Sequence, residues 1–230
     1  MRRRPIVAID GPAGAGKSTV ARRLADRLGY TLVDTGALYR AVALAARRDG
    51  VGWDDEAKVV AVAQRLEASR SLLLVADAEK GVRVMLDGAD VSDAIRTPDM
   101  GMGASRVSAI GGVRVALLNL QRQAGENGGV VLEGRDIGTV VFPDAEVKFF
   151  LTASPEVRAK RRYDELVQRG QQVDFAATLA EVKTRDENDT NRPIAPLRRA
   201  DDAVLVDSSD RAVDDIVEEM ARRVPALPRA

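Results

Sequence analysis

The segment GPAGAGKSTVARRLADRL, from Gly11 to Leu28, decides the fold. Its glycines at 11 and 16 are separated by four residues, and Lys17 and Ser18 follow directly. This is the complete pattern of a phosphate-binding loop, or P-loop, in which backbone N–H groups turn inward on an anion. The helix that follows adds the positive end of its dipole. The segment therefore predicts a binding site for the phosphates of a nucleoside triphosphate.

The residues on either side of the loop fit this mechanism. Pro5–Asp10 (PIVAID) is a short β-branched run that predicts a buried strand. From Lys17 to Leu28 apolar residues recur every four positions, which predicts a helix that stops at Gly29. A chance match is the alternative, and the position between a strand and a helix argues against it. The residues assigned to the ATP phosphates are Gly11, Pro12, Ala13, Gly14, Ala15, Gly16, Lys17, Ser18 and Thr19.

Composition narrows the classes of function. The 230 residues, 45% of them apolar, predict one domain or one domain with insertions. The chain has neither cysteine nor histidine, which excludes disulfides, thiolate zinc sites and histidine catalysis and suits a reducing cytoplasm. A formal net charge of zero and an aromatic share of 3% argue against binding of a nucleic-acid polymer. No apolar run reaches the length of a membrane span, so we expect a cytoplasmic protein.

Strands alternate with helices along the rest of the chain. Expected strands cover Tyr30–Asp34, Val130–Gly134, Glu146–Ser154 and Asp202–Ser209; expected helices cover residues 36–50, 54–66, 113–129, 154–170, 175–187 and 213–224. This order predicts a three-layer α/β fold with a five-stranded parallel sheet flanked by helices. Alternation over residues 71–92, with an Asp87–Gly88 turn, predicts a small antiparallel β insertion. We expect residues 99–112 to form a mobile connection or the start of a helix.

Carboxylates end four of the five predicted strands. They are Asp10, Asp34, Glu133 and Asp207. Because ligands of parallel sheets bind at the carboxyl ends of strands, the turns after the first three form the candidate site. Asp34 and Thr35 form the turn at the end of the second of these strands. Arg40 follows one helical turn later, where it can point back at an acceptor phosphate. The alternative is a capped helix with a solvated arginine.

Arginines gather in three later segments. Arg135 and Asp136 follow Glu133 in the turn after the third core strand. Arg158, Arg161 and Arg162 share a helical face, as do Arg185, Asp189 and Arg192. Solvated charge and surface ion pairs are the alternatives. Beside a P-loop, arginines suit phosphoryl transfer, because the transition state spreads charge over several oxygens.

Three classes of triphosphate-binding protein were compared with these features. A GTPase switch needs an Asn/Thr-Lys-x-Asp guanine motif, which is missing from the sequence. ATP-driven motors and binding modules act on polymers and are usually larger. A small-molecule kinase needs a second anion site and a cover, and the arginine segments supply both. A kinase is therefore the favoured class.

Together these motifs resemble those of the bacterial cytidylate kinases, a family of P-loop nucleoside monophosphate kinases. The resemblance runs nearly end to end through IDGPAGAGKST, DTGALYRA, DVSDAIRT, EGRDIGTVVFPDA and RDENDTNRPIAPL. It implies transfer of a phosphoryl group from ATP, with Mg²⁺, to CMP and dCMP. It also implies a single P-loop kinase domain with a core at about 1–36, 113–154 and 171–230, a monophosphate-binding insertion at about 37–112 and a helical, arginine-rich lid at about 155–170.

The resemblance also implies roles for single residues. The implied catalytic residues are Lys17, Arg158, Arg162 and Arg192, and Ser18 is the implied Mg²⁺ ligand. The implied CMP-binding residues are Arg40, Arg135 and Arg192 at the acceptor phosphate, Ser105, Arg114 and Asp136 at cytosine, Arg185 and Asp189 at the sugar, and Asp34 and Thr35 in the acceptor turn. Two residues depart from the family's usual pattern: Glu133 stands where aspartate is common, and Thr35 stands where serine is common.

Two alternatives remain open. One is a kinase of similar fold that acts on UMP or on a non-nucleotide metabolite. The other is a nucleotide-dependent regulatory or RNA-binding protein, which the balanced charge and the few aromatic residues disfavour. Because no long apolar stripe stands out on the predicted helices, we expect a monomer.

Overall fold

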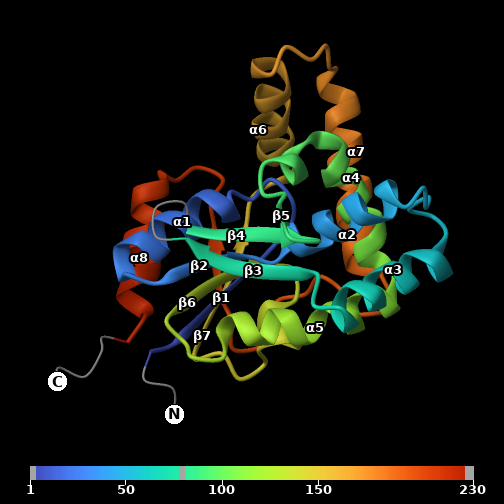
Figure 1. Ribbon diagram of the computed structural model, residues 1–230. Coiled ribbons are helices and arrows are strands. Elements are labelled where there is room, and N and C mark those ends of the chain that lie inside the picture. The colour runs from blue at the N-terminus through green and yellow to red at the C-terminus, as the bar shows by residue number, and fades with distance from the viewer. Residues whose placement is uncertain (1–3, 78–80, 226–230) are drawn as a thin grey trace. The chain divides into compact units, whose positions relative to one another are not determined.

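A computed structural model describes residues 4–77 and 81–225 of the chain (Figure 1). Internal contacts divide the chain into two compact units. The first unit comprises the residues up to Tyr30 and those from Gly128 onward, and the second comprises Thr31–Asn127.

The first unit carries the parallel sheet. Its strands are β1 (Ile6–Asp10), β6 (Val130–Gly134), β7 (Val147–Thr152) and β8 (Val204–Asp207), and its helices are α1 (Lys17–Leu28), α6 (Pro155–Gln168), α7 (Phe175–Asn191), α8 (Val213–Arg223) and the short π-helix η2 (Ile137–Val141). β1 pairs in parallel with β6 and β7, and β7 pairs in parallel with β8. With β2 (Thr31–Asp34) the strand order is β2-β6-β1-β7-β8, which confirms the predicted five-stranded parallel sheet.

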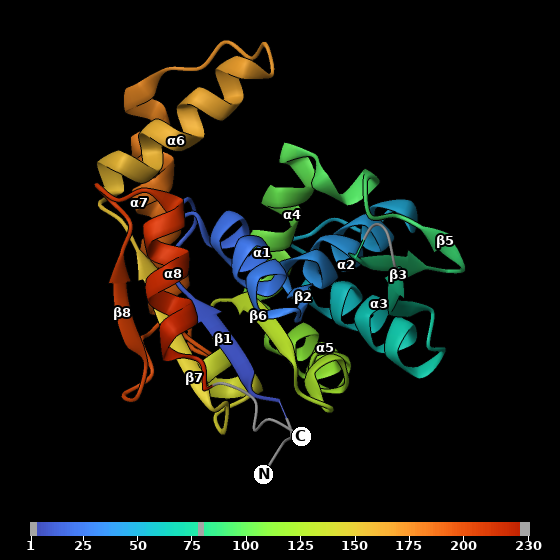
Figure 2. The same ribbon diagram turned by 90° about the vertical axis from the view of Figure 1, so that its left-hand side faces the viewer.

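The centre of this sheet positions the polar turns. All five residues of β1 are buried, as its β-branched sequence predicts. In the register of β1 with its neighbours, Asp10 lies opposite Gly134 of β6 and Phe150 of β7. The turn after β1 and the turn after β6 therefore leave the sheet at the same end. α1 packs against α8, and α6 packs against α7 (Figure 2).

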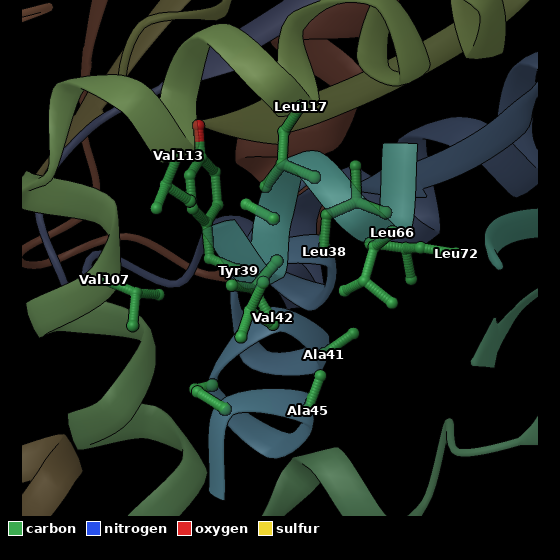
Figure 3. Close-up of a cluster of buried hydrophobic side chains, with 14 of the residues drawn as sticks. Leu38, Tyr39, Ala41, Val42, Ala45, Leu66, Leu72, Val107, Val113 and Leu117 are labelled. Carbon is green, nitrogen blue, oxygen red and sulfur yellow. The ribbon is translucent and has the colours of Figure 1, made fainter. Parts of the chain in front are cut away.

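The second unit is mostly helical. It contains α2 (Gly36–Arg48), α3 (Glu56–Ala68), α4 (Pro98–Ala109), α5 (Gly111–Gly125), the 3-10 turn η1 (Ala94–Arg96), and an antiparallel sheet of β3 (Leu72–Asp77), β4 (Gly81–Leu86) and β5 (Ala89–Asp90). Side chains of α2, α3, α4, α5 and β3 meet in its hydrophobic core (Figure 3). The predicted Asp87–Gly88 hairpin is confirmed, with φ of 50° and 79° at the two positions. Residues 78–80 of the predicted insertion lie outside the described residues.

A mobile connection at residues 99–112, one of the two expected alternatives, is wrong. The Thr97 side chain accepts the Met100 N–H at 3.2 Å and Pro98 occupies the first turn, so α4 has a regular start. At Gly103 a Cβ atom would lie 2.7 Å from the Trp53 ring and 2.8 Å from Ala43 of α2. The small residues that suggested a loop instead let α4 pack closely on α2.

Two further differences concern the candidate site. α7 continues to Asn191, beyond the expected end at residue 187, so Asp189 lies in a regular helix. The π-helix η2 directly follows Asp136 and was not expected. Within residues 4–77 and 81–225, no helix has the length and apolarity to cross a membrane.

Candidate active site

The P-loop closes tightly between β1 and α1. Positive φ values at Gly11, Gly14 and Gly16 (151°, 76° and 87°) let the backbone wrap as the motif predicts. Lys17 is only 7% exposed, and its Nζ donates to the Pro12 carbonyl at 2.7 Å. Its side chain therefore lies back over the loop.

Electrostatics around Lys17 favour an anion. Burial and the Arg135 guanidinium lower the pKa of Lys17 well below its usual value, while Glu133 and Asp10 partly oppose them. A phosphate in the loop would stabilise the charged ammonium and reverse this shift. The site is thus built for a ligand of negative charge.

A second cationic cluster lies in the same unit, around Asp189. Arg135 Nε donates to Asp189 Oδ2 at 2.9 Å, and Arg192 Nη1 lies 4.0 Å from Asp189 Oδ1. Arg192 Nη2 lies 3.9 Å from Asp136 Oδ1. Burial by itself raises the pKa of Asp189, but Arg135, with help from Arg185 and Arg192, holds it below its usual value. The structure thus brings together the five predicted acceptor-site residues of this unit.

The lid arginines differ in their surroundings. Arg158 has a side chain only 4% exposed, and its two Nη atoms bind Asp186 of α7 at 2.9 and 2.5 Å. Its Nη1 also donates to the Ala13 carbonyl of the P-loop at 3.1 Å. The alternative of a solvated face is therefore wrong for Arg158. Arg162 is half-exposed and pairs with Glu165 at 3.1 Å, so the structure does not place it at the loop.

Sequence reasoning missed a contact of the P-loop with a distant segment and the arginine that binds the contacting residue. The Ser208 hydroxyl, after β8, donates to the Ala15 carbonyl at 2.9 Å. Arg161 donates to the Ser208 carbonyl at 2.6 Å and to its hydroxyl oxygen at 3.1 Å. The helical face shared by Arg158 and Arg161 was the available signal. Nothing local to Ser208 or Asp186 marks them as supports of the loop.

The second unit holds the remaining predicted residues. Asp34 forms an ion pair with Arg40, and its carboxylate accepts the Ala37 N–H at 3.3 Å. Among the described residues, the buried Nε of Arg40 has no hydrogen-bond partner, so it has a donor to offer a ligand. Thr35 is buried at the start of α2, where the Asp34 carboxylate rather than the Thr35 hydroxyl caps the helix.

The two predicted base readers of this unit lie on α4 and at the start of α5. Arg114 is buried, donates to the Ser108 carbonyl at 3.1 Å, and has its guanidinium carbon 5.3 Å from the centre of the Tyr39 ring. Ser105 is half-buried on α4, and its carbonyl accepts the Ser108 hydroxyl at 3.1 Å. An ordered arginine held over an aromatic ring suits recognition of a planar ligand.

Comparison with known proteins identifies the family. The model of the family described as cytidylate kinase matches residues 7–226. The chain belongs to the cytidylate kinase family. The cytidylate kinase of Syntrophotalea carbinolica is 53% identical over 224 residues, which cover 97% of this chain and 93% of that protein. The cytidylate kinase of Geobacter sulfurreducens is 51% identical over 229 residues, which cover 100% of this chain and 96% of that one.

Membership of the cytidylate kinase family confirms the resemblance drawn from the motifs and makes the chain an ATP-using transferase. An uncharacterized protein from Eubacterium ventriosum has a similar structure, with a TM-score of 0.50 and 14% identity, covering 95% of this chain and 97% of its own. At that identity the likeness concerns the fold alone.

Proposed function

We propose that the chain transfers the γ-phosphoryl group of ATP reversibly to the 5′-phosphate of CMP and dCMP. An oxygen of the acceptor phosphate attacks the γ-phosphorus, and the bond to the β–γ bridging oxygen breaks with its electron pair leaving on ADP. This nucleophile is already an anion, so the reaction needs no strong base, as suits a chain without histidine. The observation that carries the proposal is the cationic cluster around Asp189 in the same unit as the P-loop lysine.

On the donor side, the P-loop N–H groups and Lys17 bind the β- and γ-phosphates. Arg158 holds the Ala13 carbonyl, and Ser208 holds the Ala15 carbonyl. Because these hydrogen bonds fix the two carbonyls, the N–H groups of the loop are held in place for an anion. Donors that are already in place need not reorient during the reaction, which lowers its barrier. Of Arg158 and Arg162, Arg162 has the greater freedom to move onto the transferring group, since its side chain is half-exposed and that of Arg158 is buried.

The residues present fit a bound Mg²⁺. The Ser18 hydroxyl donates to Glu133 Oε2 at 2.9 Å, so two hard oxygen ligands lie together beside the P-loop. Among the described residues, no group of three or more acidic, histidine or cysteine side chains is arranged to hold a metal by itself. Mg²⁺ in kinases is usually held by few side chains together with the substrate phosphates, as this donor set requires. When bound, it would neutralise charge on the phosphates.

On the acceptor side, we assign Arg40, Arg135 and Arg192 to the acceptor phosphate. Arg185 and Asp189 contact the sugar, with Asp34 and Thr35 supporting the acceptor turn. Ser105, Arg114 and Asp136 read cytosine, whose N4 amine donates to a carboxylate and whose N3 and O2 accept from arginine and serine. Uracil would place an acceptor opposite Asp136 in place of this amine.

The organisation assigned to these roles is a single P-loop kinase domain. Its core is at about 1–36, 113–154 and 171–230, its monophosphate-binding insertion at about 37–112, and its arginine-rich lid at about 155–170. We further propose that the enzyme acts as a monomer in the cytoplasm on small-molecule substrates, without a nucleic-acid partner.

Replacing either Asp136 or Arg114 by alanine is expected to weaken base selectivity more than ATP binding. A buried polar group left unpaired costs about 1–3 kcal/mol, so the wild type should prefer CMP over UMP by roughly tenfold to a few hundredfold, and both variants should lose most of that ratio. The measurement is kcat/KM for CMP and UMP, with KM for ATP alongside. Arg106→Ala is a control, because Arg106 is an exposed arginine of α4 paired with Asp54. An unchanged CMP/UMP ratio in both variants would refute the assignment of these readers.

A further inference from the structure

The carboxylate of Asp10 binds a turn far away in the sequence. Asp10 ends β1 directly before the P-loop and is only 4% exposed. Its Oδ1 accepts the Ile137 N–H and its Oδ2 accepts the Gly138 N–H, each at 2.8 Å. These two amides open the π-helix η2, immediately after Asp136. One side chain thus holds the first two amides of η2 from the end of another strand.

The two amides that Asp10 binds open a turn whose later N–H groups, those of Val140 and Val141, donate to the Asp136 carbonyl. The first N–H groups of a helix have no partner within that helix, so they need an acceptor from elsewhere. The Asp136 side chain makes no capping bond to η2, and Asp136 itself has φ of −146° and ψ of 25°, outside helical geometry. π-Helices are rare and occur mostly as single turns, frequently at functional sites. Asp10 therefore supplies the acceptors that fix where η2 begins.

Side chains of two strands lie close to this turn at Gly138. A Cβ atom at Gly138 would lie 3.0 Å from Cδ of Lys148, on β7, and 3.4 Å from Oδ2 of Asp10. Side chains of two neighbouring strands of the sheet, β1 and β7, therefore both lie against the turn at Gly138. Small changes at Asp10 should be transmitted to the residue that precedes η2, which is Asp136.

We propose that Asp10 is a positioning residue that holds Asp136 in the orientation that selects the acceptor base. This inference rests on the proposed function, in which Asp136 reads cytosine. Because Asp10 also leads directly into Gly11, the same residue joins the phosphate-donor loop to the acceptor-reading turn. Asp10 need not touch either substrate to have this effect.

The electrostatics of Asp10 fit positioning better than a contribution to stability. Burial raises the pKa of Asp10 to about 6, the two amide bonds and Lys17 oppose the shift, and the Asp136 charge adds to it. The side chain of Lys148 also lies close to Gly138. Because the folded-state pKa lies above the unfolded value, ionisation of Asp10 lowers stability as the pH rises from about 4 to about 6. The ionised carboxylate therefore opposes folding at neutral pH, but only this form offers both oxygens freely to the two amides.

The test is Asp10→Asn, which keeps the shape but leaves one acceptor oxygen and places an N–H₂ donor opposite the second amide. We expect KM for CMP to rise about tenfold and the CMP/UMP ratio of kcat/KM to fall by a similar factor, with KM for ATP and kcat at saturating CMP within about threefold of wild type. The matched control is Asp207→Asn. Asp207 also ends a core strand and accepts a backbone N–H, from Ser209 at 2.8 Å, away from η2.

The pH profile separates positioning from a general loss of structure. In the wild type, kcat/KM for CMP should fall as Asp10 is protonated below pH of about 6, and Asp10→Asn should lack that component. The phosphate of CMP titrates in the same range, but this is common to both proteins, so their difference isolates Asp10. Hydrogen exchange at the Ile137 and Gly138 amides should be slow in the wild type and faster in Asp10→Asn, whichever acceptor is used.

The outcomes distinguish this inference from the proposed function. If the wild type does not phosphorylate CMP, the proposed function fails, and the KM comparison is made with the acceptor that the enzyme does use. A folded Asp10→Asn with wild-type KM for CMP, CMP/UMP ratio and exchange at both amides would overturn the inference. Should Asp10→Asn fail to fold, Gly138→Ala crowds the same turn, because its added Cβ would lie 3.0 Å from Cδ of Lys148. A folded Gly138→Ala with unchanged KM and ratio would equally overturn it.

Discussion

Lys17→Ala should lower kcat for CMP phosphorylation by about a thousandfold. In the proposed function, the Lys17 ammonium is the P-loop cation that reaches the β- and γ-phosphates, and charge on these groups grows as the bond to the leaving oxygen breaks. In the structure Lys17 is buried over the loop, bound to the Pro12 carbonyl, and its neighbour Arg135 further disfavours its charge. The negative charge of a bound phosphate would favour the charged form of this lysine.

Lys17→Ala should keep its fold, so the fall in kcat can be attributed to the chemical step. Because the folded-state pKa of Lys17 lies below its unfolded value, the charged side chain does not favour folding at neutral pH. Steady-state kinetics with CMP and ATP, together with thermal unfolding, measure the two effects separately. The control is Lys58→Ala, at an exposed lysine of α3 paired with Asp55. Normal turnover by a folded Lys17→Ala protein would contradict the P-loop role.

Gly11→Ala is expected to lower the free energy of unfolding by about 2–5 kcal/mol. A Cβ at Gly11 would lie 1.9 Å from the Leu151 carbonyl oxygen of β7, and this clash with backbone cannot be relieved by a side-chain rotation. Its φ of 151° is also a conformation that residues with a Cβ rarely adopt. The change must therefore push the P-loop away from the sheet, and activity should fall with stability.

Urea unfolding of Gly11→Ala against the wild type gives this free energy directly. Gly52→Ala is the matched control, because a Cβ there meets no atom within 4 Å among the described residues. Its stability should stay within about 0.5 kcal/mol of the wild type. Equal stability of Gly11→Ala and Gly52→Ala would mean that the P-loop does not approach β7 as described.

Local signals in the sequence predicted the framework well. The P-loop motif and the four-residue apolar spacing predicted α1 with the bounds that the structure shows, Lys17–Leu28. The β-branched run before the loop predicted β1, and the Asp87–Gly88 pair predicted the β4–β5 hairpin. Each of these features depends on residues close together in the chain. Gly103 of α4 was misleading because the reason for it, close packing on Trp53 and Ala43, lies in another part of the chain.

The sequence predicted which residues belong to the candidate site, but it predicted only some of the contacts that these residues make. Helical spacing placed Arg158 and Arg162 on one face, but it could not show that Arg158 is buried against the Ala13 carbonyl, 145 residues away, while Arg162 pairs locally with Glu165. The carboxylate of Asp10 was noticed as a strand end. Its hold on Ile137, 127 residues away, depends on the order of strands in the sheet, which no local pattern contains.

The most direct test of the account is an ADP-release assay with ATP and Mg²⁺. The acceptors are CMP, dCMP, UMP, AMP, GMP and none, and a parallel series contains a chelator in place of the metal. The account predicts fast turnover with CMP and dCMP, much slower turnover with the other nucleotides and without an acceptor, and none with the chelator. ATP turnover that is indifferent to every acceptor would contradict it.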